Sequence, residues 1–222
     1  MKPTVFIAIP VPPEVEEFIG TYCNYRIWSN ETPISEAALL KEVKAIDGLM
    51  VNELHKINRR LLDNATRLKV VSTTAVGFDN LDLESMRMKD IIGTHTPGAM
   101  NDAVADLAFG LMLASARRII ELDRFVKNGG WRHKLGRDYF GLDVHHKTLG
   151  IIGMGRIGEV VARRGIHGFD MTVKYFNRRR KPEIEKKLGV EYAPLLELLA
   201  QSDFVVLLTP LTSNTSYWIC NG

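Results

Sequence analysis

The chain has 222 residues, of which 45% are apolar and 25% charged, and its 29 basic and 26 acidic side chains give a net charge of +3. This composition is typical of a globular protein with enough apolar side chains for a core, and it excludes a disordered chain. The densest basic cluster, residues 178–181, is followed at once by Glu183 and Glu185. A nucleic-acid partner is therefore not expected.

Membrane and metal partners are not expected either. The longest weakly polar stretch, residues 103–116, contains Asp106 and is shorter than the roughly 20 residues that a membrane-spanning helix needs. The apolar start, residues 1–10, is predicted to be a first strand. The two cysteines stand far apart in the sequence, which indicates neither a disulfide framework nor a zinc site. We expect a cytoplasmic location.

The first 98 residues alternate short apolar runs with helical patterns, as βα units around a parallel sheet do. Ser35 and Asn58 are expected N-caps of the second and third helices. Pro97 and Gly98 mark the end of this domain. The pattern predicts strands at 5–9, 25–28, 49–51, 68–72 and 91–94, and helices at 14–19, 35–44, 59–65 and 83–89.

The second half begins with apolar residues at helical spacing, which predict one long interdomain helix over 101–127 with Asn101 as its cap. Residues 128–147 are predicted to form a functional or oligomer-contact loop. The alternation then restarts, and its last strand is expected to be the fourth, pairing beside the first. The pattern predicts strands at 148–153, 172–176, near Glu191 and at 204–208, and helices at 156–168, 183–188 and 195–200.

A glycine motif, G-x-G-x-x-G, lies between the strand at 148–153 and the helix that follows it. Gly153 permits a tight turn, Gly155 lets a pyrophosphate approach the backbone, and Gly158 lets the helix approach the sheet. The helix N-terminus would hold the pyrophosphate, with Arg156 adding positive charge. The alternative is a glycine-containing turn of an ordinary βα unit.

The next strand ends at Asn177, where NAD-binding proteins carry an acidic residue for the adenosine ribose. A neutral side chain followed by Arg178, Arg179 and Arg180 favours the 2'-phosphate of NADP over NAD, although NAD stays possible. The alternative is that the arginines form a solvated face that pairs with Glu183 and Glu185.

Four segments, in order, are similar to a known family: STTAVGFDNLD at 72–82, THTPG at 94–98 with DAVAD at 102–106, KTLGIIGMGRIG at 147–158, and SDF at 202–204 with TPLT at 209–212. The chain resembles the D-isomer-specific 2-hydroxyacid dehydrogenases, and among them the glyoxylate, hydroxypyruvate and 2-ketogluconate reductases. The resemblance implies an α/β fold of two doubly wound parallel-sheet domains: a flavodoxin-like substrate domain at 1–98 and an incomplete Rossmann dinucleotide-binding domain at 99–222.

The resemblance also implies hydride transfer between NADP(H) or NAD(H) and a small 2-keto acid, and a homodimer in the full-length form. It assigns the substrate carboxylate to Val76 and Gly77, together with the loop after the strand at 49–51. It assigns the cofactor to Val76 at the nicotinamide, to Gly153, Gly155, Arg156, Ile157 and Gly158 at the pyrophosphate, to Asn177, Arg178 and Arg179 at the adenosine, and to Thr209 and Pro210 in the cleft.

The chain departs from the family in two places. The loop Asn52-Glu53-Leu54-His55 replaces a smaller, glycine-containing loop. The resemblance places the catalytic arginine, glutamate and histidine beyond Gly222, and the tail loses the family's register after Thr215, so we expect a truncated chain that is inactive by itself. None of the six histidines is expected to act as the acid. The alternative is a non-catalytic dinucleotide-binding module or an inactive truncated gene product.

Overall fold

The computed structural model describes residues 2–30, 32–132, 136–212 and 215. Two compact units divide the chain, unit 1 from Met1 to Ala99 and unit 2 from Met100 to Pro210, with short C-terminal pieces assigned to each. The unusual tail sequence at 216–222 lies outside the described residues.

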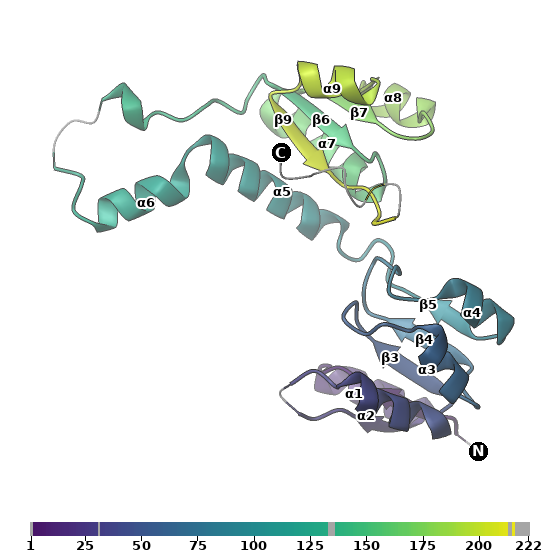
Figure 1. Cartoon of the computed structure of the whole chain (residues 1–222). Coiled ribbons are helices and arrows are strands. Elements are labelled where there is room, and N and C mark those ends of the chain that lie inside the picture. Colours follow the sequence, from purple (N-terminus) through teal and green to yellow (C-terminus); the bar gives the residue numbers. More distant parts are fainter. Residues whose placement is uncertain (1, 31, 133–135, 213–214, 216–222) are drawn as a thin grey trace. The chain divides into compact units, whose positions relative to one another are not determined.

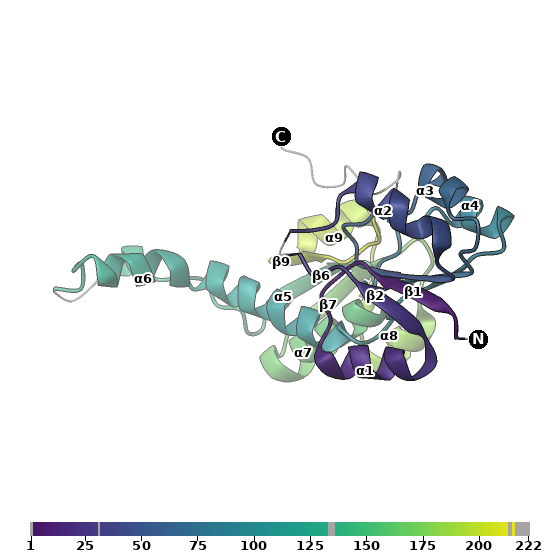
Figure 2. The same ribbon diagram turned by 90° about the horizontal axis from the view of Figure 1, so that it is seen from below.

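Unit 1 is a five-stranded parallel sheet with the strand order β2-β1-β3-β4-β5 (Figure 1). Helix α1 covers one side of this sheet, and α2, α3 and α4 cover the other (Figure 2). The predicted flavodoxin-like order is confirmed, with element ends shifted by a few residues. The elements are β1 (Thr4–Ile7), α1 (Pro13–Tyr22), β2 (Asn24–Ile27), α2 (Glu36–Glu42), the 3-10 turn η1 (Val43–Ala45), β3 (Gly48–Val51), α3 (Arg59–Asn64), β4 (Val70–Thr73), α4 (Leu83–Met88) and β5 (Ile92–Thr94).

Local sequence signals set the helix starts of unit 1. Ser35 accepts the Ala38 N–H and Asn58 accepts the Leu61 N–H, so both predicted caps are confirmed. The inner strands β1 and β3 carry apolar residues on both faces because helices cover both sides of the parallel sheet. The unit therefore has a core of its own, which includes Val43, Ile46, Leu49, Val51, Ile57, Leu61, Leu62 and Val71.

Unit 2 contains four parallel strands in the order β8-β7-β6-β9. Strand β9 pairs with β6, as predicted for a fourth strand beside the first. The core of this unit includes Leu149, Ile151, Val161, Val173 and Tyr175. The elements around the sheet are β6 (Thr148–Ile152), α7 (Arg156–Phe169), β7 (Thr172–Phe176), α8 (Pro182–Leu188), β8 (Glu191–Tyr192), α9 (Leu195–Gln201) and β9 (Phe204–Leu207).

Helix α5 (Asn101–Ala116) packs against α7 within unit 2. Its Phe109 ring stacks on Phe169, with ring centroids 5.0 Å apart. Arg164 of α7 donates hydrogen bonds to Asp106 and Asp102 at the start of α5, at 2.9 and 3.1 Å. The predicted cap is wrong, because Asn101 is already helical and Met100 holds the cap position without a side-chain hydrogen bond.

The single helix predicted over 101–127 is wrong as well, because the structure has two helices, α5 and α6 (Ile119–Lys127). Arg118 between them is left-handed, with φ of +55°. The segment that follows α6 returns to the end of α5. There the Leu142 N–H donates to the carbonyl of Ala116, the last residue of α5, at 2.7 Å. Arg118 also donates to the Asp138 carbonyl. Long-range contacts, which helical periodicity cannot reveal, therefore break the helix.

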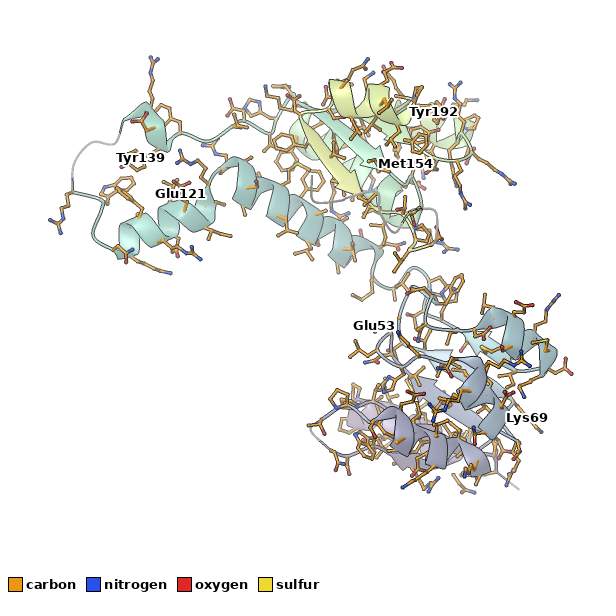
Figure 3. The ribbon with its side chains drawn as sticks, viewed as in Figure 1. Glu53, Lys69, Glu121, Tyr139, Met154 and Tyr192 are labelled. Atoms are coloured by element: carbon orange, nitrogen blue, oxygen red, sulfur yellow. The ribbon has the colours of Figure 1, made fainter. Side chains whose placement is uncertain are left out.

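The segment after α6 contains one 3-10 turn, η2 (Arg137–Tyr139), and in its described parts no other helix or strand. The Tyr139 ring lies 4.8 Å from that of Phe125 on α6, so the returning segment is attached to the helix (Figure 3). Among the described residues, no helix is long and apolar enough to cross a membrane.

Candidate functional site

The turn from β6 to α7 is built by Gly153 and Gly158. Gly153 has φ of +106°, and a Cβ there would lie 2.8 Å from the backbone of Leu208, just after β9. A Cβ on Gly158 would lie 2.6 Å from the Gly153 carbonyl oxygen. Any side chain at these positions would force the loop away from the sheet or from the helix. The two glycines therefore have the roles that the motif predicts.

Gly155 differs from the other two, because among the described residues, apart from its two chain neighbours, no atom lies within 4 Å of the position that its Cβ would occupy. It is the N-cap of α7, and the first hydrogen bond from the helix to the loop is from the Glu159 N–H to the Gly155 carbonyl at 3.0 Å. The preceding N–H groups of a helix have no partner within it and attract anions. The space beside Gly155 therefore fits a pyrophosphate held by the backbone at Arg156 and Ile157.

Asn177 fixes this loop from the end of β7. Its Oδ1 accepts the Met154 N–H at 2.8 Å, and its Nδ2 donates to the Met154 carbonyl at 3.2 Å. Met154 itself is fully buried beneath the loop, at the position labelled in Figure 3. The amide both accepts from and donates to the backbone of one residue, which an ionised carboxylate cannot do because it lacks a donor. Asn177 thus shapes the phosphate loop, a role that the sequence did not reveal.

The three arginines after Asn177 separate into two groups. Arg180 donates to both oxygens of Glu185, at 2.8 and 2.7 Å, as the solvated-face alternative expected. Arg178 and Arg179 are exposed, and the described residues give them no ion-pair or hydrogen-bond partner. Two guanidinium groups therefore stay available beside the loop.

Glu185 is held by a second donor, the hydroxyl of Tyr175, at 2.6 Å. The hydrogen bonds from Arg180 and Tyr175 lower the pKa of Glu185 to about 2. Burial, together with the hydrogen bond to Glu185, raises the pKa of Tyr175 to about 12. The Tyr175 hydroxyl also accepts the Lys181 N–H at 2.7 Å, so this cluster fixes the chain between β7 and α8.

Thr209 and Pro210 lie after Leu208, just beyond the carboxyl end of β9 and on the same side of the sheet as the glycine loop. The Thr209 nitrogen would lie 3.0 Å from a Cβ on Gly153, so the two loops are in close contact. The site in unit 2 therefore draws on the ends of β6, β7 and β9, as open α/β sheets do.

In unit 1, Val76 and Gly77 lie in the loop after β4. Thr96 fastens this loop by donating to the carbonyls of Thr74 and Ala75, at 2.8 and 3.1 Å. The ring nitrogen Nδ1 of His95 lies 2.9 Å from the Val76 carbonyl oxygen, so it donates there. Because the carbonyl and the following N–H of a trans peptide point in opposite directions, this bond turns the Gly77 N–H away from His95. An N–H that points away from His95 can donate a hydrogen bond to a carboxylate.

The loop after β3 is organised by Asn52 and Asn80. Asn52 Oδ1 accepts the Leu54 N–H at 3.1 Å and lies 2.7 Å from His55 Nδ1. Asn80 donates to the carbonyls of Asn52 and His55, both at 3.0 Å. These hydrogen bonds hold the loop 52–55 in place although it lacks the glycine that the resemblance leads us to expect. The sequence did not reveal that Asn80 holds this loop. The signal that was available is its place in the segment 72–82, which is similar to the family.

The structure thus gathers the predicted residues into two groups, one in each unit. Gly153, Gly155, Arg156, Ile157, Gly158, Asn177, Arg178, Arg179, Thr209 and Pro210 belong to unit 2, and Val76 and Gly77 belong to unit 1. The described residues contain no group of three or more His, Cys, Asp or Glu side chains that could hold a metal ion.

Residues 109–221 match the family described as D-isomer specific 2-hydroxyacid dehydrogenase, NAD binding domain. Among curated proteins, the chain is 43% identical to the glyoxylate reductase of Thermococcus kodakarensis, over 99% of this chain and 67% of that protein. It is 42% identical to the glyoxylate reductase of Pyrococcus horikoshii, over 99% of this chain and 66% of that protein. The chain spans about two thirds of the length of these relatives.

Solved structures give the same result. The TT0316 protein from Thermus thermophilus matches with a TM-score of 0.86 and 36% identity, over 96% of this chain and 66% of that one. A glyoxylate reductase from Paecilomyes thermophila matches with a TM-score of 0.85 and 27% identity, over 98% and 68%. Sequence and fold agree along nearly the whole chain, and it belongs to the D-isomer specific 2-hydroxyacid dehydrogenases.

Proposed function

We propose that this protein is an oxidoreductase that transfers a hydride between a nicotinamide dinucleotide and a small 2-keto acid such as glyoxylate, hydroxypyruvate or 2-ketogluconate. The observation that carries the proposal is the open space at Gly155, at the N-terminus of α7, in a loop that Asn177 holds in place. When bound there, the cofactor supplies the hydride. The chain's own part is to bind the pyrophosphate through backbone N–H groups.

NADP(H) is the cofactor that we propose, in preference to NAD(H). Arg178 and Arg179 are exposed and unpaired among the described contacts, and guanidinium groups bind phosphate in a bidentate manner. Isothermal titration of the 222-residue chain with NADPH and NADH tests this choice. Replacing Arg178 and Arg179 together by Ala should weaken NADPH binding by about tenfold or more, roughly 1.4 kcal/mol, and leave NADH binding nearly unchanged.

A matched control for that experiment is Arg87→Ala, which removes an exposed arginine from unit 1. It should change neither affinity. Equal NADPH and NADH affinities in the unmodified chain would contradict the NADP proposal, whereas binding of neither dinucleotide would contradict the proposed function itself.

The substrate carboxylate is proposed to bind at Val76 and Gly77, where the His95 contact turns the Gly77 N–H away from His95. Reduction also needs a cation for the carboxylate and a proton donor for the carbonyl oxygen. We propose that the family's arginine, glutamate and histidine fill these roles from positions beyond Gly222. A polypeptide of residues 1–222 should therefore bind NADPH but not oxidise it with glyoxylate, hydroxypyruvate or 2-ketogluconate.

Following NADPH absorbance at high protein concentration tests this expectation, with Gly155→Asp as the matched control. Addition of the family's C-terminal third should restore turnover. Turnover by the 222-residue chain above the Gly155→Asp control would show that its own residues complete the reaction. An extended chain that binds NADPH but reduces no 2-keto acid would instead favour a non-catalytic dinucleotide-binding module.

We further propose that the full-length protein is a homodimer joined through α6 and the segment that returns from it. Figure 1 shows α6 extending away from the sheet of unit 2. None of its residues is buried, and large apolar side chains are exposed on it and after it. The exposed apolar residues are Ile119, Ile120, Val126, Trp131, Phe140 and Leu142.

Light scattering after size-exclusion chromatography of the full-length protein should give the mass of a dimer. Ile120→Asp should shift the protein to a monomer, whereas the control Leu196→Asp on α9 should not.

A further inference from the structure

The segment that carries the three arginines is short, and it is fastened at both of its ends. It runs from Asn177, after β7, to Lys181, just before α8. At its start, the Asn177 side chain binds the Met154 backbone at 2.8 and 3.2 Å. At its end, the Lys181 N–H donates to the hydroxyl of Tyr175 at 2.7 Å. The three arginines therefore lie between two fixed points.

The hydroxyl of Tyr175 is the group that fixes the second end. Tyr175 stands on β7, two residues before Asn177, and its side chain is fully buried. A hydroxyl has one hydrogen to donate, and this one is donated to Glu185 Oε1 at 2.6 Å. Because an ionised carboxylate only accepts, the hydroxyl keeps its lone pairs for the Lys181 N–H. Glu185 thus sets the direction in which Tyr175 binds the arginine segment.

Arg180 completes the same cluster. Its Nε and Nη2 donate to the two carboxylate oxygens of Glu185, at 2.8 and 2.7 Å. Its guanidinium also lies 5.9 Å from the centre of the Tyr192 ring on β8, the residue labelled in Figure 3. Protein groups therefore hold this arginine, whereas Arg178 and Arg179 have no ion-pair or hydrogen-bond partner among the described residues.

A fixed segment favours the binding of a phosphate by its arginines. An arginine on a mobile loop has to be ordered when it binds, and this ordering costs affinity. The bond from Lys181 to Tyr175 supplies the order before a cofactor arrives. The glycine loop is fixed separately, by Asn177 and by its own close contacts. Loss of the Tyr175 hydroxyl should therefore affect a 2'-phosphate and leave the pyrophosphate position in place.

We propose that the Tyr175 hydroxyl is a positioning group for NADP(H), which holds Arg178 and Arg179 ready for the 2'-phosphate. This inference rests on the proposed function, because it takes these two arginines to bind NADP(H). It assigns a part in the choice of cofactor to a fully buried side chain.

Tyr175→Phe removes only the hydroxyl, and titration calorimetry of the 222-residue chain measures the effect. The variant should bind NADPH about fivefold more weakly, a ratio that corresponds to about 1 kcal/mol. Its NADH affinity should stay within about twofold of the unmodified chain, because no phosphate contact is lost. The matched control is Tyr192→Phe, which removes a hydroxyl without a hydrogen-bond partner among the described residues. It should change neither affinity.

A double-mutant cycle separates positioning from a general loss of stability. In a chain whose Arg178 and Arg179 are both replaced by Ala, Tyr175→Phe should have little further effect on NADPH binding, because the hydroxyl acts through these arginines. A merely structural role would weaken NADPH binding equally in both backgrounds and weaken NADH binding too. That result, or an unchanged NADPH affinity in Tyr175→Phe, would overturn the inference and leave the NADP proposal standing. If replacing the two arginines has no effect, both are wrong.

Nitrogen-15 relaxation of the unmodified chain gives a test that does not depend on how the variant folds. Without cofactor, the amides of Arg178 and Arg179 should have order parameters of about 0.85, the value of rigid backbone. The Lys181 amide should be protected from hydrogen exchange by its bond to Tyr175. Order parameters below about 0.6 would overturn the inference, because the arginines would then not be held before the cofactor binds.

Discussion

Asn177 fixes the phosphate loop, and we propose that it also contributes to the choice of cofactor. Its amide holds the Met154 backbone by two hydrogen bonds, and it leaves the neighbouring arginines without a competing negative charge. An aspartate would keep the bond from the Met154 N–H, lose the bond to the Met154 carbonyl and repel a 2'-phosphate.

Asn177→Asp should therefore weaken NADPH binding by about tenfold or more, and NADH binding less, since a lost hydrogen bond costs about 1 kcal/mol and repulsion affects only the phosphate. Titration calorimetry with both dinucleotides measures the change. Asn128→Asp, which makes the same substitution at the exposed end of α6, is the control. An unchanged NADPH affinity in Asn177→Asp would show that this residue has no role in binding the cofactor.

Glu185 makes a pH-dependent contribution to the stability of unit 2. Its pKa falls from an ordinary value of 4.5 to about 2 through Arg180 and Tyr175. A folded-state pKa below the unfolded one means that the stabilisation is complete above about pH 5 and is lost as the pH falls toward 2. Glu185→Gln should accordingly lower the melting temperature at pH 6 and make it less sensitive to acid.

Differential scanning calorimetry between pH 6 and pH 2 measures that dependence. Glu183→Gln, two residues away in the same helix and without a described ion pair, should follow the unmodified chain. If Glu185→Gln and the unmodified chain lose the same number of degrees over this range, the cluster with Tyr175 does not stabilise the fold.

At the scale of the element, two of the three glycines of helix α7 have opposite surroundings. Gly158 has the Gly153 carbonyl against it, whereas no described residue outside the helix lies within 4 Å of the Cβ position of Gly168. Gly158→Ala should destabilise unit 2 by about 1–3 kcal/mol through overpacking and also weaken NADPH binding. Gly168→Ala should stabilise it by up to about 1 kcal/mol, because alanine favours the helix. Urea unfolding measures the change in the free energy of unfolding for both variants. Equal changes for Gly158→Ala and Gly168→Ala would refute the close approach of α7 to the loop.

At the scale of the whole molecule, each unit has a core of its own. Leu49 in unit 1 and Leu149 in unit 2 are both fully buried, and replacing either by Ala should cost about 2–5 kcal/mol. Hydrogen exchange measured by mass spectrometry should become faster in unit 1 for Leu49→Ala and in unit 2 for Leu149→Ala. Faster exchange in both units for either variant would mean that the two cores unfold together.

The sequence by itself determined the features that depend on neighbouring residues. Apolar periodicity located the strands and helices, Ser35 and Asn58 marked helix starts, and the glycine motif located the turn before α7. These signals are local, because caps, turns and amphipathic faces are set within a few residues. The cofactor loop was predictable for the same reason.

Only the tertiary structure decided the features that join distant segments. The break at Arg118 comes from the returning segment, the Asn177 amide is used by Met154, and Arg180 alone of the three arginines pairs with Glu185. The crevice lined by residues that follow β1, β2 and β3 likewise needs the ends of three strands that are separate in the sequence. Hydrogen bonds and cavities between such segments leave no periodic pattern in a sequence, since they depend on where the fold brings each side chain.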